Sequence, residues 1–336
     1  MSLSSACPLC AGRRHVPLAS VDRDRNPLRN VLCQGCGLVF VDPQPTREAL
    51  DAWYTQNYRL DYKGVLEPKP HHVLRAGRVA IDRLARIRPL LLGAPRVLDV
   101  GSGGGEMLYM LTHLAGTRAE GLEPNLGYAR HARERLGLPV HVGTIDQLGQ
   151  MSDTFDLVTI HHVLEHLPHP REAMALLSAR LRPGGHLVVE VPNVEATCQA
   201  PAHTFHRAHL TTWGIPTLER LGIECGLTPV SAATSPDGGN IDVVFVRDGA
   251  RPLPADLAPA RTAGYADHVA QVFARHTPLR HYASPAVPRR LFSRLARSVD
   301  ERIACRRASD PRALLDALVA AARGTVAFRG LASSAV

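Results

Sequence analysis

The chain has 336 residues, 45% of them hydrophobic and 21% charged, which is the composition of an ordinary globular protein large enough for two or three parts. It contains no apolar run of about 18 residues and no charged start followed by an apolar core, so neither a membrane span nor a secretory signal is expected. We therefore expect a cytoplasmic protein without membrane contact. The formal net charge of +8 comes almost entirely from arginine, since only Lys63 and Lys69 are lysines.

Four cysteines near the N-terminus are spaced for one metal ion. They form two CxxC pairs, Cys7-Pro-Leu-Cys10 and Cys33-Gln-Gly-Cys36, separated by 22 residues. Four thiolates in this arrangement can surround one tetrahedral zinc ion, and in a cytosolic chain the spacing favours zinc over disulfides. No open coordination position is expected, so the sequence predicts a structural zinc ribbon. With the turn and short helix of "VDPQPTREALDAWYTQNY", it makes up a predicted first part, residues 1–70.

A predicted central part, residues 71–250, begins with a helix from about His72 to Leu91. The apolar run Val97–Val100 then predicts a short buried strand. It runs into "GSGGG", a tight glycine loop that opens a helix near Glu106. Glycines let the backbone approach a ligand closely, and the free N–H groups of a helix start favour an anion.

Further strands alternate with helices along the central part. They are "RAEGLEP", "PVHVGT", "FDLVTIHH" and "HLVVEVP", followed by a hairpin, "SAATSPDGGNIDVVFVRDG". This alternation predicts an α/β fold, a Rossmann-like, doubly wound and mostly parallel seven-stranded sheet, with ligands bound at the carboxyl ends of its strands. Glu123 ends the second strand, 24 residues after Asp99, where a carboxylate can accept both hydroxyls of a ribose.

The stretch "TIHHVLEHLPHP" holds four histidines and one glutamate. If its middle is helical, His162, Glu165 and His166 stand at positions i, i+3 and i+4 and share one face. Such a face can bind a metal ion, supply a base that removes a proton from a substrate, or only line a pocket.

The last part, residues 251–336, follows the proline-rich linker "ARPLPADLAPA" and is predicted to be a basic helical extension. It holds 14 arginines against six acidic residues, and so accounts for the whole net charge. One of its helices places four apolar residues on a single stripe: Leu291, Leu295, Val299 and Ile303. We expect this extension to pack against the rest of the chain, and the alternative is an arginine-lined lid over an anionic substrate.

Several ordered motifs of the central part resemble those of the class I S-adenosylmethionine-dependent methyltransferases. The motifs are "LDVGSGGGEML", "GLEPNLGYARHARERLG", "FDLVTIHHVLEHLPHP" and "LRPGGHLVVEVPN". The resemblance implies S-adenosylmethionine as the cofactor, with Asp99, Gly101 and Gly103 at its methionine end and Glu123 at its ribose. In full, the residues that it places around the cofactor are Asp99, Gly101, Ser102, Gly103, Glu123, Pro124, Thr144, Ile145, His161 and His162.

The N-terminal motif "CQGCGLVFVDPQPTREALDAWY" is similar to zinc-ribbon methyltransferases of sugar and glycan pathways, some of which methylate carbon in deoxysugars. In that branch a Tyr-x-Glu-His-Leu element after the fifth strand supplies the base. Here "FHRAHL" keeps His209 and Leu210, but His206 replaces the tyrosine and Ala208 the glutamate. The resemblance thus implies a catalytic role for His209. The other catalytic candidates are His166, Glu165 and His206.

We therefore expect an enzyme that O-methylates a small sugar-like, nucleotide-sugar or natural-product acceptor, with a histidine as the base. Sugar C-methylation and RNA methylation are the alternatives. Nucleic acid is not expected as a partner, because the tail has no lysines and the ribbon lacks interleaved basic and aromatic residues. A second ion, bound by His162, Glu165, His166 and His209, is a further alternative, similar to the metal site of some small-RNA 3′-end and ubiquinone-pathway O-methyltransferases. The sequence leaves the oligomeric state open.

Overall fold

The structure is a computed structural model that describes residues 5–45, 67–248, 254 and 256–325. The short helix predicted after Pro45 and much of the predicted linker lie outside these residues. The chain forms two compact units that interleave along the sequence, residues 1–50 with 160–287 and residues 51–159 with 288–336. The division into three consecutive parts stays a prediction.

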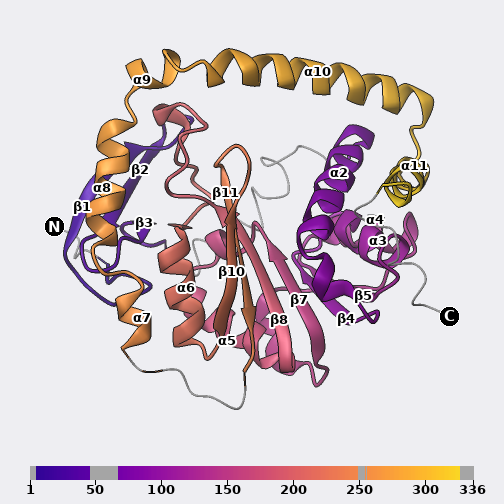
Figure 1. Cartoon of the computed structure of the whole chain (residues 1–336), viewed down its shortest axis with the longest axis horizontal. Helices are drawn as coiled ribbons and strands as arrows, with labels where there is room; N and C mark the ends of the chain where they lie inside the picture. Colours follow the sequence, from indigo (N-terminus) through magenta and orange to yellow (C-terminus); the bar gives the residue numbers. More distant parts are fainter. Residues whose placement is uncertain (1–4, 46–66, 249–253, 255, 326–336) are drawn as a thin grey trace. The chain divides into compact units, whose positions relative to one another are not determined.

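The central sheet has seven strands in the order β10-β11-β8-β7-β4-β5-β6 (Figure 1). The pairs β4–β5 and β5–β6 are parallel, whereas β11 runs antiparallel to both β8 and β10. The predicted strands and the predicted terminal hairpin are thus confirmed. Their bounds are β4 (Arg96–Val100), β5 (Arg118–Glu123), β6 (Val140–Val142), β7 (Phe155–His161), β8 (Leu181–Pro192), β10 (Thr228–Thr234) and β11 (Asn240–Val246).

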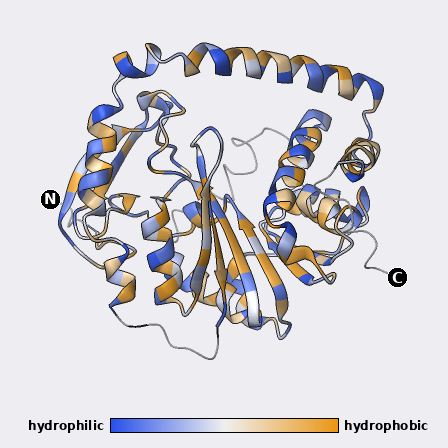
Figure 2. Ribbon diagram, in the orientation of Figure 1, coloured by the Kyte–Doolittle hydropathy of each residue, from blue (hydrophilic) through white to orange (hydrophobic). Residues whose placement is uncertain are grey.

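The strands of this sheet are apolar because most of them are covered on both faces. Val97, Leu98 and Val100 of β4 are at most 2% exposed, and β7 and β8 carry long hydrophobic segments (Figure 2). The helices that accompany the sheet are α2 (Pro70–Arg86), α3 (Glu106–His113), α4 (Leu126–Glu134), α5 (Pro170–Ala179) and α6 (Ile215–Glu224).

A second sheet, of four antiparallel strands, belongs to the first unit. It has the order β1-β2-β3-β9, with β1 (His15–Val21), β2 (Pro27–Cys33), β3 (Val39–Val41) and β9 (Thr211–Thr212). The N-terminal hairpin supplies three of these strands, and β9 comes from the segment after His209, through the pairs Val39–Thr212 and Phe40–Thr211. This sheet therefore joins the cysteine-bearing hairpin to the segment that carries the predicted catalytic histidine.

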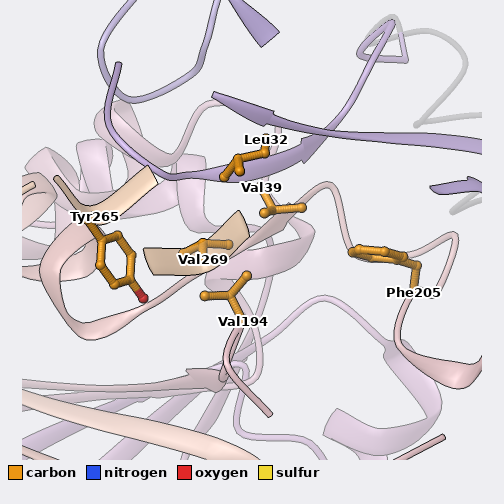
Figure 3. Packing of buried hydrophobic residues seen from close by; sticks show 6 residues of the cluster. All are labelled: Leu32, Val39, Val194, Phe205, Tyr265 and Val269. Carbon is orange, nitrogen blue, oxygen red and sulfur yellow. The ribbon is translucent and has the colours of Figure 1, made fainter. Parts of the chain in front are cut away.

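One hydrophobic cluster holds the N-terminal hairpin to the rest of the first unit. Helix α8 (Tyr265–Arg275) packs into it, and the rings of Phe205 and Phe273 stack with centroids 5.8 Å apart. Burying a side chain of this size stabilises the fold by roughly 1.5–3 kcal/mol. Figure 3 shows the six buried members, Leu32, Val39, Val194, Phe205, Tyr265 and Val269.

The C-terminal segment is helical, as predicted, but its long helix does not bury the expected stripe. Helix α11 packs closely on α2, since a Cβ on Gly77 would lie 2.7 Å from a methyl carbon of Leu315. Helix α10 instead contacts α2 through its polar face, where Arg75 donates to Glu301, and the four stripe residues are 46–59% exposed. The bounds are α7 (Leu257–Ala260), α9 (Pro278–Tyr282), α10 (Ala286–Arg307) and α11 (Pro311–Arg323).

Two local predictions are wrong for backbone reasons. The helix expected to reach Leu91 ends at Arg86 and is followed by a 3₁₀ helix at Arg88–Leu91, because Pro89 cannot donate the next helical hydrogen bond. The residues "LRPGG", whose proline and two glycines predict a turn before "HLVVEVP", instead form the start of β8. Within the described ranges, none of the helices combines the length and the apolar character that a membrane crossing needs.

Candidate active site

The loop between β4 and α3 has the backbone conformation of a glycine-rich loop that binds a nucleotide. Gly101, Gly103 and Gly105 have φ values of 75°, 56° and 91°, which only glycine adopts without strain. A Cβ at Gly103 would meet no atom within 4 Å, so the space over this residue is open to a ligand. Helix α3 begins at Glu106, as predicted, and directs its free N–H groups toward the loop.

Glu123, at the end of β5, is bonded to this loop. Its Oε2 accepts the Gly103 N–H at 2.8 Å and its Oε1 accepts the Asn125 N–H at 2.8 Å. Burial raises the pKa of Glu123 above its usual value, and the two amides act in the opposite direction. Each oxygen keeps a second lone pair, so the carboxylate can still accept the two hydroxyls of a ribose.

The remaining predicted cofactor residues of the second unit also lie at strand ends. Asp99 is buried near the end of β4 and accepts a hydrogen bond from the Thr159 hydroxyl at 2.7 Å. Ser102 is buried within the loop, and Pro124 is exposed after β5. Thr144 and Ile145 follow β6, where a 3₁₀ helix begins. In the first unit, His161 ends β7 and His162 comes next.

Glu123→Ala should weaken binding of S-adenosylmethionine by about 1–3 kcal/mol, the cost of losing a charged partner of buried hydrogen bonds. The measurement is isothermal titration calorimetry with the cofactor alone. Glu134→Ala is the matched control, because Glu134 is exposed on α4 and forms an ion pair with the equally exposed Arg130. An unchanged affinity in Glu123→Ala would remove this carboxylate from the cofactor site.

The four N-terminal cysteines meet in space as the sequence predicts. The Sγ atoms of Cys7 and Cys36 are 3.6 Å apart, those of Cys10 and Cys33 are 3.4 Å apart, and one atom from each residue lies within 4.8 Å of all the others. Tetrahedral zinc with Zn–S bonds of 2.3 Å requires sulfur–sulfur separations of about 3.8 Å, so the arrangement fits the ion.

His162 is held between two buried carboxylates. Its Nδ1 lies 3.3 Å from Glu165 Oε1 and its Nε2 lies 3.1 Å from Glu190 Oε1. Burial acts to lower its pKa, but the two carboxylates outweigh burial and raise the pKa of His162 to about 9. Its φ of 55° is unusual for a residue with a side chain, and strain of this kind gathers at functional sites. His162 is thus a cation at neutral pH and a poor base.

The expected helical face does not form. Only Leu164–His166 are helical, as a 3₁₀ turn, and His162 lies outside it in a left-handed conformation. Glu165 and His166 are nevertheless brought together with His209, and ligand atoms from these three residues lie within 4.8 Å of one another. The rings of His166 and His209 meet edge to face with centroids 5.0 Å apart. The structure therefore assembles three of the four residues expected to bind a second ion and leaves out His162.

Glu165 is the buried charge of this group. Its side chain is 1% exposed, and its Oε2 has no hydrogen-bond partner among the described residues. Burial acts to raise the pKa of Glu165, but hydrogen bonding to His162 and the nearby rings outweigh burial and lower it. A buried carboxylate with an unused oxygen can accept a proton or a ligand atom, or can stabilise a positive charge on a neighbouring imidazole.

The backbone of Ala208 sets the orientation of two histidine rings. Its N–H donates to His206 Nδ1 at 3.2 Å, and its carbonyl accepts from His166 Nδ1 at 2.8 Å. His166 therefore carries a proton on Nδ1, and Nδ1 of His206 carries none. Ala208, which stands where the Tyr-x-Glu-His-Leu element has a glutamate, thus acts here through its peptide group.

His206 and His209 are neutral at pH 7. Burial lowers the pKa of His209 to about 3, and Glu165 opposes this effect without cancelling it. Burial, together with the charge of Arg23, lowers the pKa of His206 to about 4. The rings of the two residues lie 5.4 Å apart, so His166, His209 and His206 form a row of three imidazoles that begins beside Glu165.

Sequence reasoning missed two contributors to this site. Glu190, in β8, binds His162 through both its side chain and its carbonyl, and only the sheet register brings them together. Arg207 lies between the two predicted histidines in the chain and pairs with Asp22 of the N-terminal hairpin at 3.2 Å. In the sequence, the pairing of Arg207 with Asp22 is indicated only by the presence of a charged residue between the two histidines.

Comparison with known proteins agrees with the geometry. Residues 71–232 match a family described as "Methyltransferase domain". The ubiquinone biosynthesis O-methyltransferase of Aromatoleum aromaticum is 34% identical over 134 residues, which cover 38% of this chain and 55% of the relative. The enzyme of the same name from Paramagnetospirillum magneticum is 38% identical over 93 residues, which cover 26% of this chain and 37% of the relative. The chain thus spans about half, or less, of the length of these relatives.

Among solved structures, magnesium protoporphyrin IX methyltransferase from Synechocystis PCC 6803 has a TM-score of 0.46 at 14% identity, over 60% of this chain and 100% of that one. The family match covers the glycine loop, Glu123 and the segment with Glu165 and His209. Residues 71–232 are therefore similar to a methyltransferase domain.

Proposed function

We propose that the protein is an O-methyltransferase that acts on a hydroxyl group of a small molecule. The observation that carries this proposal is the buried Glu165 carboxylate beside the ring of His166 and the neutral ring of His209. The curated relatives that match this domain are named as O-methyltransferases, which supports transfer to oxygen.

His209 acts as the base in this proposal. S-adenosylmethionine supplies an electrophilic methyl group. The imidazole takes the hydroxyl proton as the oxygen attacks, an O–C bond forms, and the S–C bond breaks to leave a thioether. Glu165 then stabilises the imidazolium that forms on His209, much as a buried carboxylate does in a catalytic triad. This help is needed because the pKa of His209, near 3, makes the isolated ring a weak proton acceptor.

The cofactor is assigned to the glycine loop and the strand ends of the second unit. Glu123 holds the ribose hydroxyls, and the loop amides and Asp99 hold the methionine end. Thr144 and Ile145 lie beside the adenine. His161 also stays in this set, but His162 does not suit a place beside the positive sulfonium, because it is itself a cation at neutral pH.

A structural zinc ion at Cys7, Cys10, Cys33 and Cys36 completes the proposal. The sulfur–sulfur distances support it, and a Cβ on Gly12 would lie only 3.2 Å from Cys10 Sγ, which shows how closely the backbone turns around the thiols. The ion would hold together a hairpin too small to fold around a core of its own.

The acceptor can be a phenol, a sugar or a nucleotide-sugar, and it can be anionic. Sugar C-methylation stays the main alternative, because the N-terminal motif and His209 resemble that branch. Methylation of RNA is the second alternative. These classes differ in the atom that receives the methyl group and in the size of the acceptor, so one assay with three acceptor types separates them.

Purified protein should transfer a labelled methyl group from S-adenosylmethionine to a small hydroxyl acceptor. The panel contains a catechol, a thymidine diphosphate deoxysugar and total RNA, and the methylated atom is assigned by nuclear magnetic resonance (NMR). Transfer to carbon would replace the proposal with C-methylation, and transfer only to RNA would favour the second alternative. No transfer to any of the three would contradict the proposed function for these acceptor classes.

The same assay after chelation tests the second ion. We expect turnover to survive when every ion except the N-terminal zinc has been removed, with that zinc measured separately. If turnover is lost and returns with an added divalent ion, Glu165, His166 and His209 act as metal ligands instead of as a base and its partners.

A further inference from the structure

The segment that carries His206 and His209 is hydrogen-bonded to the N-terminal hairpin at two positions. We call residues 201–210 the histidine loop. Near its middle, the Arg23 N–H donates to the Phe205 carbonyl at 2.8 Å, and at its end the Val41 N–H donates to the Leu210 carbonyl at 3.0 Å. The chain then continues into β9, which pairs with β3. The hairpin therefore holds the histidine loop in place through backbone hydrogen bonds and through the pairing of β3 with β9.

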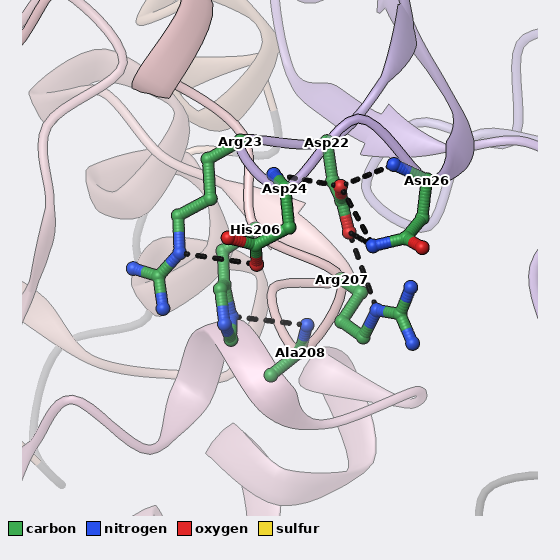
Figure 4. Close-up of polar contacts among 7 residues, drawn as sticks. All are labelled: Asp22, Arg23, Asp24, Asn26, His206, Arg207 and Ala208. Carbon is green, nitrogen blue, oxygen red and sulfur yellow. Dashed lines mark hydrogen bonds and ion pairs between the residues drawn. The ribbon is translucent and has the colours of Figure 1, made fainter. Parts of the chain in front are cut away.

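Asp22 stands at the turn of this hairpin, between β1 and β2. Its Oδ1 accepts the N–H groups of Asp24 at 2.9 Å and Asn26 at 2.8 Å, which closes the turn. Its Oδ2 accepts from Arg207 Nε at 3.2 Å (Figure 4). Asp22 is 2% exposed. Burial acts to raise its pKa, but the Asn26 amide and Arg207 outweigh burial, so the pKa lies below its usual value and the carboxylate is ionised at neutral pH.

Arg207 is placed where a small movement would disturb the site. It follows His206 directly and precedes Ala208, whose N–H and carbonyl bind the rings of His206 and His166. One residue further, the His209 N–H donates to the His206 carbonyl at 2.9 Å, so residues 206–209 form one closed turn. Figure 4 shows the Arg207 side chain extending to Asp22 while His206 and Ala208 are bonded to each other.

We propose that Asp22 is a positioning residue for the active site: by holding Arg207, it keeps the Ala208 peptide where its two polar groups orient His206 and His166. The proposal rests on the proposed function, in which these rings lie beside the base. The proposal also gives the cysteine-bearing hairpin a role in positioning the active site. In this proposal the hairpin sets the geometry of the histidine loop.

A change in the orientation of these rings can be observed by NMR. A change in the stability of the fold alone would not produce the same signal. In the wild type, Nδ1 of His166 is a donor and Nδ1 of His206 is an acceptor, so each ring has one fixed tautomer. If the Ala208 peptide moves, both rings lose the partner that selects the tautomer, and each becomes a mixture. Long-range proton–nitrogen NMR spectra separate these cases without any acceptor.

Asp22→Asn is the most selective variant. Asparagine keeps an oxygen that can accept the two turn amides, but it loses the charge that holds Arg207. We expect mixed tautomers at His166 and His206, and exchange of the Leu210 amide proton about tenfold faster than in the wild type. Arg207→Gln removes the other charge of the ion pair and should give the same result. Arg207→Lys keeps the positive charge, so both rings should retain the single tautomers of the wild type.

Asp24→Asn is the matched control, since it removes the same charge from the same turn, where Asp24 forms an ion pair with exposed Arg23 at 3.6 Å but, among the described residues, none with Arg207. It should leave the tautomers fixed. The proposal is overturned if both Asp22→Asn and Arg207→Gln keep fixed tautomers and wild-type exchange, or if Asp24→Asn disturbs the rings equally. Fixed tautomers in a wild type that transfers no methyl group would contradict the proposed function instead, because the NMR measurement uses no acceptor.

Discussion

His209→Ala is expected to lower kcat for methyl transfer by about 100- to 10,000-fold, the usual contribution of a positioned base. The affinity for S-adenosylmethionine should stay within about twofold, because the assigned cofactor contacts come from Glu123 and the glycine loop. The physical reason is that His209 is neutral at pH 7 and adjoins Glu165, whose carboxylate can stabilise the imidazolium. His162 is a cation at pH 7, so it cannot take up the proton in place of His209.

The control for this variant lies in the same loop. His203 is exposed and near the start of the histidine loop, so His203→Ala removes an imidazole without touching the row of three rings. We expect its turnover to be close to that of the wild type. Kinetics are measured with whichever panel acceptor the wild type methylates. Near-wild-type turnover in His209→Ala would make this residue a bystander and would shift the role of base to His166 or His206.

Cys33→Ser is expected to remove the zinc and to destabilise the first unit by about 3 kcal/mol or more, since metal binding at such a site is coupled to folding. Elemental analysis should fall from one zinc per chain to a small fraction of that value. Cys33 ends β2, two strands away from β9, so loss of the ion should also loosen β9 and the histidine loop. Amide exchange followed by mass spectrometry measures this effect along the chain.

Affinity for S-adenosylmethionine should be largely retained in Cys33→Ser, because the glycine loop and Glu123 belong to the second unit. Cys198→Ser is the matched control, as Cys198 lies outside the four-thiol cluster. It should keep its zinc and its stability. A wild type that is well folded and free of zinc would rule out the structural ion, whatever the behaviour of the variants.

Local patterns in the sequence were enough to predict the central sheet and the cofactor loop. Runs such as Val97–Val100 are apolar because they are buried on both faces. Gly101, Gly103 and Gly105 are needed because their φ values are positive. The four cysteines were also predictable, since a metal site needs fixed ligand types at short spacings. In each case the determining interactions involve residues close together in the chain, or a repeating pattern of strand and helix.

The tertiary structure decided the chemistry around Glu165. His162 was expected to share a helical face with Glu165 and His166, but the sheet brings Glu190 beside it, and the two carboxylates raise its pKa so that it is a cation at neutral pH. The apolar stripe of α10 was expected to pack against the rest of the chain. Instead, Glu301 and Asp300 form ion pairs with arginines of α2, so the polar face of α10 lies against α2. The pairing of Asp22 with Arg207 joins residues far apart in sequence. Amphipathic spacing and motif matches report only local geometry. The pKa of a side chain and the partner of a helix face depend on which distant charges folding brings within a few ångströms, and no pattern along the chain encodes that distance.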